Sequence, residues 1–160
     1  MSWDEYFINL LSPLSIRSKD ESQKLGAVIV GKDKQIISTG YNSFPRGIKD
    51  DIPERQDRPL KYHFMAHAEE NAIVNAALNG SSTKDSRLYV SWWPCSACAR
   101  MIVNAGISVV VLQYEEIYDR WYDSCNCGRR MFEESGVDVF TWDGELRKAL
   151  MEIKSIQGKP

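Results

Sequence analysis

The sequence predicts an α/β domain of three layers, in which a mixed sheet of about five strands lies between helices. Two observations support this fold class. A helical segment and two short apolar runs come first, and helical and strand-like segments then alternate to the C-terminus. The length of 160 residues fits one domain, 1–160, and 43% apolar and 26% charged residues are typical of a soluble globular protein.

The first predicted element is a helix from about Trp3 to Ser18, because its apolar residues recur at helical spacing. Ser2 is a suitable N-cap, and Glu5 would complete a capping box. Pro13 lies inside this pattern, so we expect it to kink or shorten the helix.

Two strands should follow as a hairpin, over 25–30 and 36–41, around a turn at 31–34. The stretch 42–65 has little periodicity and three prolines, so it predicts a long loop. A loop of this length in a compact domain is usually functional, although a solvated insertion is the plainer alternative.

The second half alternates between helix and strand up to an irregular aromatic stretch at 114–127. The segment His67–Asn79 should be a helix ended by Gly80, and the run Val109–Leu112 should be a strand covered on both faces. The other predicted elements are a strand at 87–91, a helix at 95–105, a helix at 127–135, a strand at 137–140 and a C-terminal helix at 144–156.

The charge balance and the cysteine count limit the possible functions. A net charge of −2 and a pI near 5.7 argue against a nucleic-acid partner, which would favour a basic excess. No apolar run approaches the length of a membrane span, and the acidic start of the chain does not resemble a signal peptide. Four cysteines suit a reducing compartment, so we expect a cytoplasmic protein.

The candidate site is formed by His67-Ala68-Glu69 and Pro94-Cys95-Ser96-Ala97-Cys98. The side chains of His67, Cys95 and Cys98 are good zinc ligands, and three ligands leave one tetrahedral position open, as in catalytic zinc sites. Both cysteines lie at the predicted start of a helix, whose positive end favours thiolates. Glu69 is suited to carry protons beside the metal.

Two plainer interpretations of these residues compete with a catalytic zinc site. An isolated Cys-x-x-Cys can be a redox pair or half of a structural zinc site, and His-x-Glu alone carries little information. A structural site would need a fourth ligand, for which Cys125 and Cys127 are the candidates, but their Cys-x-Cys spacing is poor. The combination of His-x-Glu with Pro-Cys-x-x-Cys is the pattern of the zinc nucleobase deaminases.

Most of the chain, from Trp3 to about Phe140, resembles the deoxycytidylate (dCMP) deaminases of the cytidine deaminase superfamily. The similar stretches are Arg17-Ser18-Lys19-Asp20, Gly26–Val30, Ser38–Asn42, Phe44-Pro45-Arg46-Gly47, His67–Ile73 and Pro94–Ala99. The zinc motif alone specifies only the superfamily. The Gly-Tyr-Asn and Phe-Pro-Arg-Gly runs, together with the long insert before His67, point to dCMP.

The resemblance implies an enzyme that deaminates dCMP to dUMP and ammonia and so supplies dUMP for thymidylate synthesis. Zinc held by His67, Cys95 and Cys98 would lower the pKa of its water, and Glu69 would transfer the protons. The resemblance also implies that the Ala68 backbone N–H binds the pyrimidine O2 and that Asn42 binds the sugar hydroxyl.

The sequence leaves the contacts to the phosphate and the base open. Arg46 is the favoured phosphate contact, because it lies near Asn42 and its planar guanidinium suits phosphate; the other cations considered are Lys19, Lys24 and Arg120. Tyr118 could contact the nucleotide or pack in the core. Trp92 and Trp93 could stack on the base or close the core, and we expect at least one of them near the pocket.

The resemblance further implies a homo-oligomer, commonly a hexamer, and control by dCTP with Mg²⁺ as activator and dTTP as inhibitor. The effector motif of the family, Gly-Tyr-Asn-Gly, includes Asn42 but has Ser43 as its last residue here. A side chain at this position would resist a positive φ or a close backbone approach. Two other function classes remain, a deaminase of tRNA and a zinc-containing nucleotide sensor without catalysis, although the sensor would not require Glu69.

Overall fold

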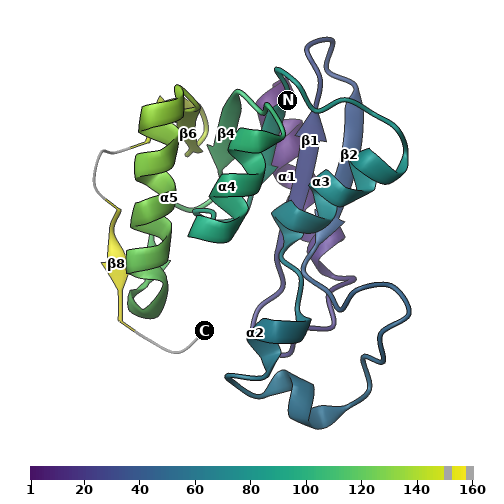
Figure 1. Cartoon of the computed structure of the whole chain (residues 1–160). Coiled ribbons are helices and arrows are strands. Elements are labelled where there is room, and N and C mark those ends of the chain that lie inside the picture. Colours follow the sequence, from purple (N-terminus) through teal and green to yellow (C-terminus); the bar gives the residue numbers. More distant parts are fainter. Residues whose placement is uncertain (150–152, 158–160) are drawn as a thin grey trace.

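The computed structural model describes residues 1–149 and 153–157 (Figure 1). Its main sheet has six strands in the order β2-β1-β3-β4-β6-β7, one more than predicted. The central strands β3, β4 and β6 are parallel, and the other neighbours pair antiparallel. The strands are β1 (Gly26–Val30), β2 (Ile36–Tyr41), β3 (Arg87–Val90), β4 (Val109–Leu112), β6 (Asp138–Trp142) and β7 (Leu146–Lys148).

Helices cover both faces of this sheet, which confirms the predicted three-layer α/β fold. Helix α1 (Trp3–Ser15) packs on one face, where Phe7 and Leu11 join a buried cluster with β1 and β3. Helices α3 (Ala68–Leu78), α4 (Ser96–Asn104) and α5 (Tyr122–Ser135) cover the other face and contribute to the larger core (Figure 1). The start of α3 and the start of α4 thus lie on the same side of the sheet.

The first helix forms as its sequence predicts, except at its end. The Ser2 side chain accepts a hydrogen bond from the Glu5 N–H, and the Glu5 carboxylate accepts one from the Ser2 N–H. The helix ends at Ser15 rather than Ser18, two residues after Pro13. Proline removes a helical donor, which favours an early end.

The long insert between β2 and α3 contains two short elements, a 3-10 turn at η1 (Pro53–Gln56) and a single helical turn at α2 (Lys61–Phe64). They lie beyond the end of the sheet, below α3 in Figure 1. None of the helices within 1–149 and 153–157 is long and apolar enough to span a membrane.

The C-terminal part differs most from the prediction. Helix α5 begins at Tyr122 rather than about Cys127, after a short strand β5 (Ile117–Tyr118) and the turn η2 (Asp119–Trp121). The predicted helix at 144–156 is wrong in its described parts. Residues 146–148 form β7, antiparallel to β6, and β8 (Ser155–Ile156) pairs with β5, while 150–152 lie outside the described residues.

Candidate active site

The predicted metal ligands come together at the starts of two helices. His67 is the N-cap residue of α3, and Cys95 is the N-cap residue of α4. The Nδ1 atom of His67 lies 3.5 Å from the Sγ atoms of both Cys95 and Cys98, and the three ligand atoms lie within 4.8 Å of one another. Tetrahedral zinc, with bonds of about 2.3 Å to sulfur and 2.0–2.1 Å to nitrogen, would place them about 3.5 Å apart. The three side chains therefore fit a zinc ion.

The charges around these ligands favour a cation. Burial alone would lower the pKa of His67, but the hydrogen bond with Cys95 and the charge of Glu69 raise it to about 9. The pKa of Cys95 is lowered to about 4, mainly by its hydrogen bond with Cys98 and against the effect of burial. A thiolate and a carboxylate that attract a proton to His67 would equally attract a divalent metal ion.

Glu69 lies in the first turn of α3, two residues beyond His67, with only 7% of its surface exposed. Burial is the main cause that raises the pKa of its carboxyl group, and the neighbouring Cys95 thiolate raises it further. The charge of His67 acts in the opposite direction, but the net effect is a raised pKa, and such a carboxyl group takes up a proton more readily than an exposed one.

Glycines allow the surrounding elements to approach closely. A Cβ atom on Gly40 of β2 would lie 2.3 Å from the carbonyl oxygen of Ala68, so only glycine permits this contact between β2 and the start of α3. On the other side, a Cβ atom on Gly128 of α5 would lie 2.9 Å from the Pro94 carbonyl oxygen. The Ser124 hydroxyl of α5 also accepts a hydrogen bond from the Ser96 N–H at 3.0 Å. Helix α5 thereby supports the start of α4.

A single pocket joins the candidate ligands to the loop before β1. Its lining includes His67, Glu69 and Cys95, and also Asp20 and Asn42. Other lining residues come from the insert, from the residues after β3, from the segment before α5 and from α5 itself: Arg58, Lys61, Tyr62, Met65, Ser91, Trp92, Trp93, Ile117, Arg120, Trp121 and Cys125.

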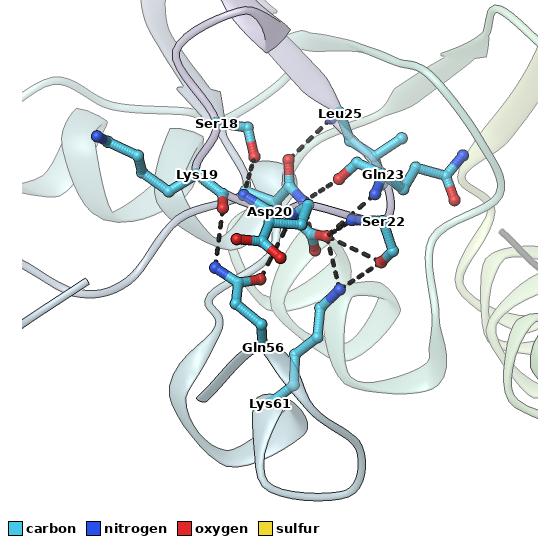
Figure 2. A network of polar contacts seen from close by, with 10 residues as sticks. Ser18, Lys19, Asp20, Ser22, Gln23, Leu25, Gln56 and Lys61 are labelled. Atoms are coloured by element: carbon cyan, nitrogen blue, oxygen red, sulfur yellow. Dashed lines mark hydrogen bonds and ion pairs between the residues drawn. The ribbon is translucent and has the colours of Figure 1, made fainter. Parts of the chain in front are cut away.

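The pocket wall at Asp20 is a network of hydrogen bonds (Figure 2). One carboxylate oxygen of Asp20, Oδ1, accepts from the backbone N–H groups of Ser22 and Gln23 at 2.8 and 3.0 Å. It also accepts from the buried Lys61 ammonium at 2.6 Å. The Asn42 amide N–H₂ donates to Asp20 Oδ2 at 3.2 Å and to the Gln23 carbonyl at 2.8 Å. The Asn42 Oδ1 atom accepts from the Leu25 N–H at 2.8 Å.

The structure does not bring every predicted contact into this pocket. Arg46 lines a separate cavity and donates to Asn75 Oδ1 at 2.5 Å, and Ser43 lines that cavity too. Tyr118 packs behind the wall, with its ring 5.0 Å from that of Trp92. Both Trp92 and Trp93 line the active-site pocket, although Trp93 is 4% exposed.

Arg58, Lys61 and Trp121 are among the pocket residues that sequence reasoning missed. Arg58 and Lys61 lie in the aperiodic insert, where no helical or strand periodicity predicts which side chains point into the protein. The available signal was that the insert carries lysine and arginine beside aromatic residues immediately before His67. The Trp121 ring lies 5.8 Å from the His67 ring, at a steep angle.

Comparison with known proteins identifies the family. The model of the cytidine and deoxycytidylate deaminase zinc-binding region matches residues 1–114. The chain belongs to this deaminase family. It is similar to human deoxycytidylate deaminase, with 33% identity over 165 aligned positions that cover 100% of this chain and 90% of the human protein.

Solved structures of this deaminase family give the same relationship. The dCMP deaminase of cyanophage S-TIM5 in its apo form is 28% identical, with a TM-score of 0.69 over 86% of this chain and 95% of the phage chain. The same phage enzyme in complex with dCMP and dUMP is 26% identical over 87% of this chain and 96% of that one, again with a TM-score of 0.69. The family model describes a zinc-binding region, and the matched residues 1–114 include His67, Cys95 and Cys98, whose geometry fits a zinc ion.

Proposed function

We propose that this chain is a zinc-dependent dCMP deaminase, a hydrolase that converts dCMP and water to dUMP and ammonia. The observation that carries the proposal is that His67, Cys95 and Cys98 form one ligand cluster, and that His67 and Cys95 of this cluster line the same pocket as Glu69. The similarity to deoxycytidylate deaminases over the whole chain supports the choice of nucleotide.

In this proposal His67, Cys95 and Cys98 hold the zinc ion, and Glu69 is the catalytic acid and base. When bound, zinc supplies a Lewis acid that lowers the pKa of a water molecule towards neutrality. Glu69 takes a proton from the attacking water and delivers it to ring N3. It then takes the second proton of that water, from the new C4 hydroxyl, and gives it to the amine, so that C4 becomes a carbonyl as the bond between C4 and the amine nitrogen breaks. One carboxylate can serve throughout, because it regains its charge each time it gives up a proton.

The base and the sugar are assigned to groups on the pocket walls. The Ala68 N–H is in the first turn of α3, where backbone N–H groups have no partner within the helix, so it is available to the pyrimidine O2. Asn42 already uses both amide hydrogens, so a sugar hydroxyl would have to donate to its Oδ1 atom. Trp92 and Trp93 are placed to contact the base.

For the 5′-phosphate we propose Arg58 and Arg120 in place of Arg46. Both line the active-site pocket. Burial lowers the pKa of Arg120, and the like charge of Arg58 lowers it further, so the two guanidinium groups are close enough to repel one another. Within 1–149 and 153–157, neither has an ion-pair partner. The Cζ atom of Arg58 lies 5.9 Å from the centre of the Tyr62 ring, and the Cζ atom of Arg120 lies 5.8 Å from the centre of the Trp121 ring. Two unpaired guanidiniums suit a phosphate dianion.

We further propose that the separate cavity binds a regulatory nucleotide, dCTP with Mg²⁺ or dTTP. Arg17, Lys19 and Arg46 supply positive charge there. Ser43 does not have a positive φ, and its backbone pairs with Ala66, the residue before His67. Asn42 lines the active-site pocket and Ser43 lines the cavity, so neighbouring residues connect the two. Rates with and without dCTP–Mg²⁺, for the native chain and for Ser43→Gly, test this proposal.

The proposal includes a homo-oligomer, as a hexamer, and a cytoplasmic location. Val74 and Leu78 of α3 are 43% and 69% exposed, which suits a contact between subunits. All four cysteines are free of disulfide bonds, which suits a reducing compartment. Light scattering on the purified protein measures the oligomeric state directly.

The experiment that tests the activity is the initial rate of deamination by zinc-loaded protein on dCMP, CMP, deoxycytidine, dCTP and a tRNA stem-loop. A clear preference for dCMP is the expected result. Turnover of deoxycytidine or RNA without turnover of dCMP would overturn the choice of substrate. No turnover of any of them would favour a sensor without catalysis.

A further inference from the structure

Lys61 is a buried cation on the insert. It is 5% exposed and is the one buried residue of α2. Its ammonium donates to Asp20 Oδ1 at 2.6 Å and to the Ser22 hydroxyl at 2.5 Å (Figure 2). Lysine is seldom buried unless it is paired, so this contact, together with the hydrogen bond from the Gln56 side chain to the Lys19 carbonyl at 2.9 Å, holds the insert on the body of the protein.

The partner of Lys61 in turn fixes the orientation of Asn42. Asp20 Oδ2 accepts one hydrogen of the Asn42 amide, and the Gln23 carbonyl accepts the other. If the amide were turned over, its oxygen would face both of these acceptors. Together with the Leu25 N–H, which donates to Asn42 Oδ1 at 2.8 Å, the carboxylate therefore keeps the amide in this orientation, and Lys61 stabilises the carboxylate in its charged form.

Lys61 also sets the position of its neighbours on the insert. Arg58 lies three residues before it and Tyr62 one residue after it, and both line the active-site pocket. One buried ion pair thus joins the amide proposed for the sugar to the guanidinium proposed for the phosphate.

We propose that Lys61 is a positioning residue for the sugar–phosphate half of the nucleotide, acting through Asp20 on Asn42 and through α2 on Arg58. This inference rests on the proposed dCMP deaminase activity. Since the base-facing groups lie on other elements, Lys61 acts on nucleotide binding and hardly on the chemical step.

The first test compares Lys61→Met with the native chain by the KM and kcat for dCMP and by the Kd for dUMP, measured by calorimetry. We expect KM and Kd to rise about tenfold to a hundredfold, as for the loss of a hydrogen-bonded charge, with kcat within about threefold. Lys61→Arg should recover part of the binding. Lys32→Met is the matched control, because Lys32 forms an exposed ion pair with Asp85 and should change neither constant.

A double variant separates positioning from mere stability. In Asp20→Asn with Lys61→Met, no buried charge is left unpaired, so the melting temperature should return towards that of the native chain. The amide introduced at position 20 would keep its oxygen on the N–H groups of Ser22 and Gln23 and turn its N–H₂ against that of Asn42. Binding of dUMP should therefore stay weak although stability recovers.

Recovery of dUMP binding together with stability in the double variant would overturn the proposal, as would native KM and Kd in a folded Lys61→Met. If Lys61→Met does not fold, the double variant alone decides. A native chain that turns over no dCMP would instead refute the proposed activity, which the same assay reports separately.

Discussion

Replacement of Glu69 by glutamine is the most direct test of the proposed chemistry. The change keeps the size of the side chain and removes its charge. The three ligand side chains are unaltered, so bound zinc should remain stoichiometric. Burial raises the pKa of Glu69, which means that its charged form is disfavoured in the pocket. Glu69→Gln should therefore unfold at the same temperature as the native chain or slightly above it.

The expected loss of activity follows from the number of proton transfers assigned to this residue. A single positioned acid or base contributes about 10²–10⁴-fold to a rate. Glu69 is assigned transfers both before and after the attack on C4, and it is 7% exposed, so bulk water cannot readily replace it. We expect kcat to fall by about 10⁴-fold, with a much smaller change in KM.

The assay is the loss of cytosine absorbance on dCMP, with zinc content measured on the same samples. Glu70→Gln is the matched control, because it removes the next carboxylate on the same helical turn, and Glu70 is half-buried and does not line the pocket shared by Glu69 and Asn42. It should retain most of the activity. If Glu69→Gln with full zinc kept more than about a tenth of the native kcat, the assigned role would be refuted.

Three further outcomes are expected. Gly40→Ala should lower the free energy of unfolding by about 1–3 kcal/mol in urea titrations, since its Cβ would lie 2.3 Å from a backbone oxygen; an unchanged midpoint would contradict the close packing. Cys98→Ser should lose most of its zinc, while Cys127→Ser, at an exposed position, should keep it. Burial would raise the pKa of Asp20, but Lys61 and nearby N–H groups lower it below its ordinary 3.8. This lowered pKa stabilises the folded state above pH 3.8, and the stabilisation is lost as the pH falls through the lower pKa that Asp20 has in the folded state. When the free energy of unfolding is measured against pH, Lys61→Met should therefore lose less stability than the native chain in this acid range.

The cluster of metal ligands could be predicted because the features that define it lie within short stretches of the sequence. Ligand types, their spacing and the starts of two helices are all readable in the sequence, and a strand before each helix brings the starts to one side of a sheet. Glu69 followed from the same run. The three ligands lie together in the structure, and Glu69 lines the same pocket as His67 and Cys95.

The insert and the C-terminal part could not be predicted in the same way. The insert is held in place by a long-range ion pair, Lys61 with Asp20, which no periodicity in the sequence predicts. At 146–148, residues of good helix propensity instead form an edge strand, because Leu146 packs beside Trp142 against the cluster on the α1 face. Tertiary packing outweighs local preference in such short segments.

The pairing of β5 with β8 bears on how the protein matures during synthesis. Ile117 and Tyr118 begin the segment that carries Arg120 and Trp121 into the pocket, and they pair with Ser155 and Ile156. During synthesis, His67, Cys95 and Cys98 emerge from the ribosome well before Ser155 and Ile156 do. The nascent chain can therefore gather its metal cluster early, whereas the wall that faces the nucleotide acquires its final support only after residue 156 has emerged.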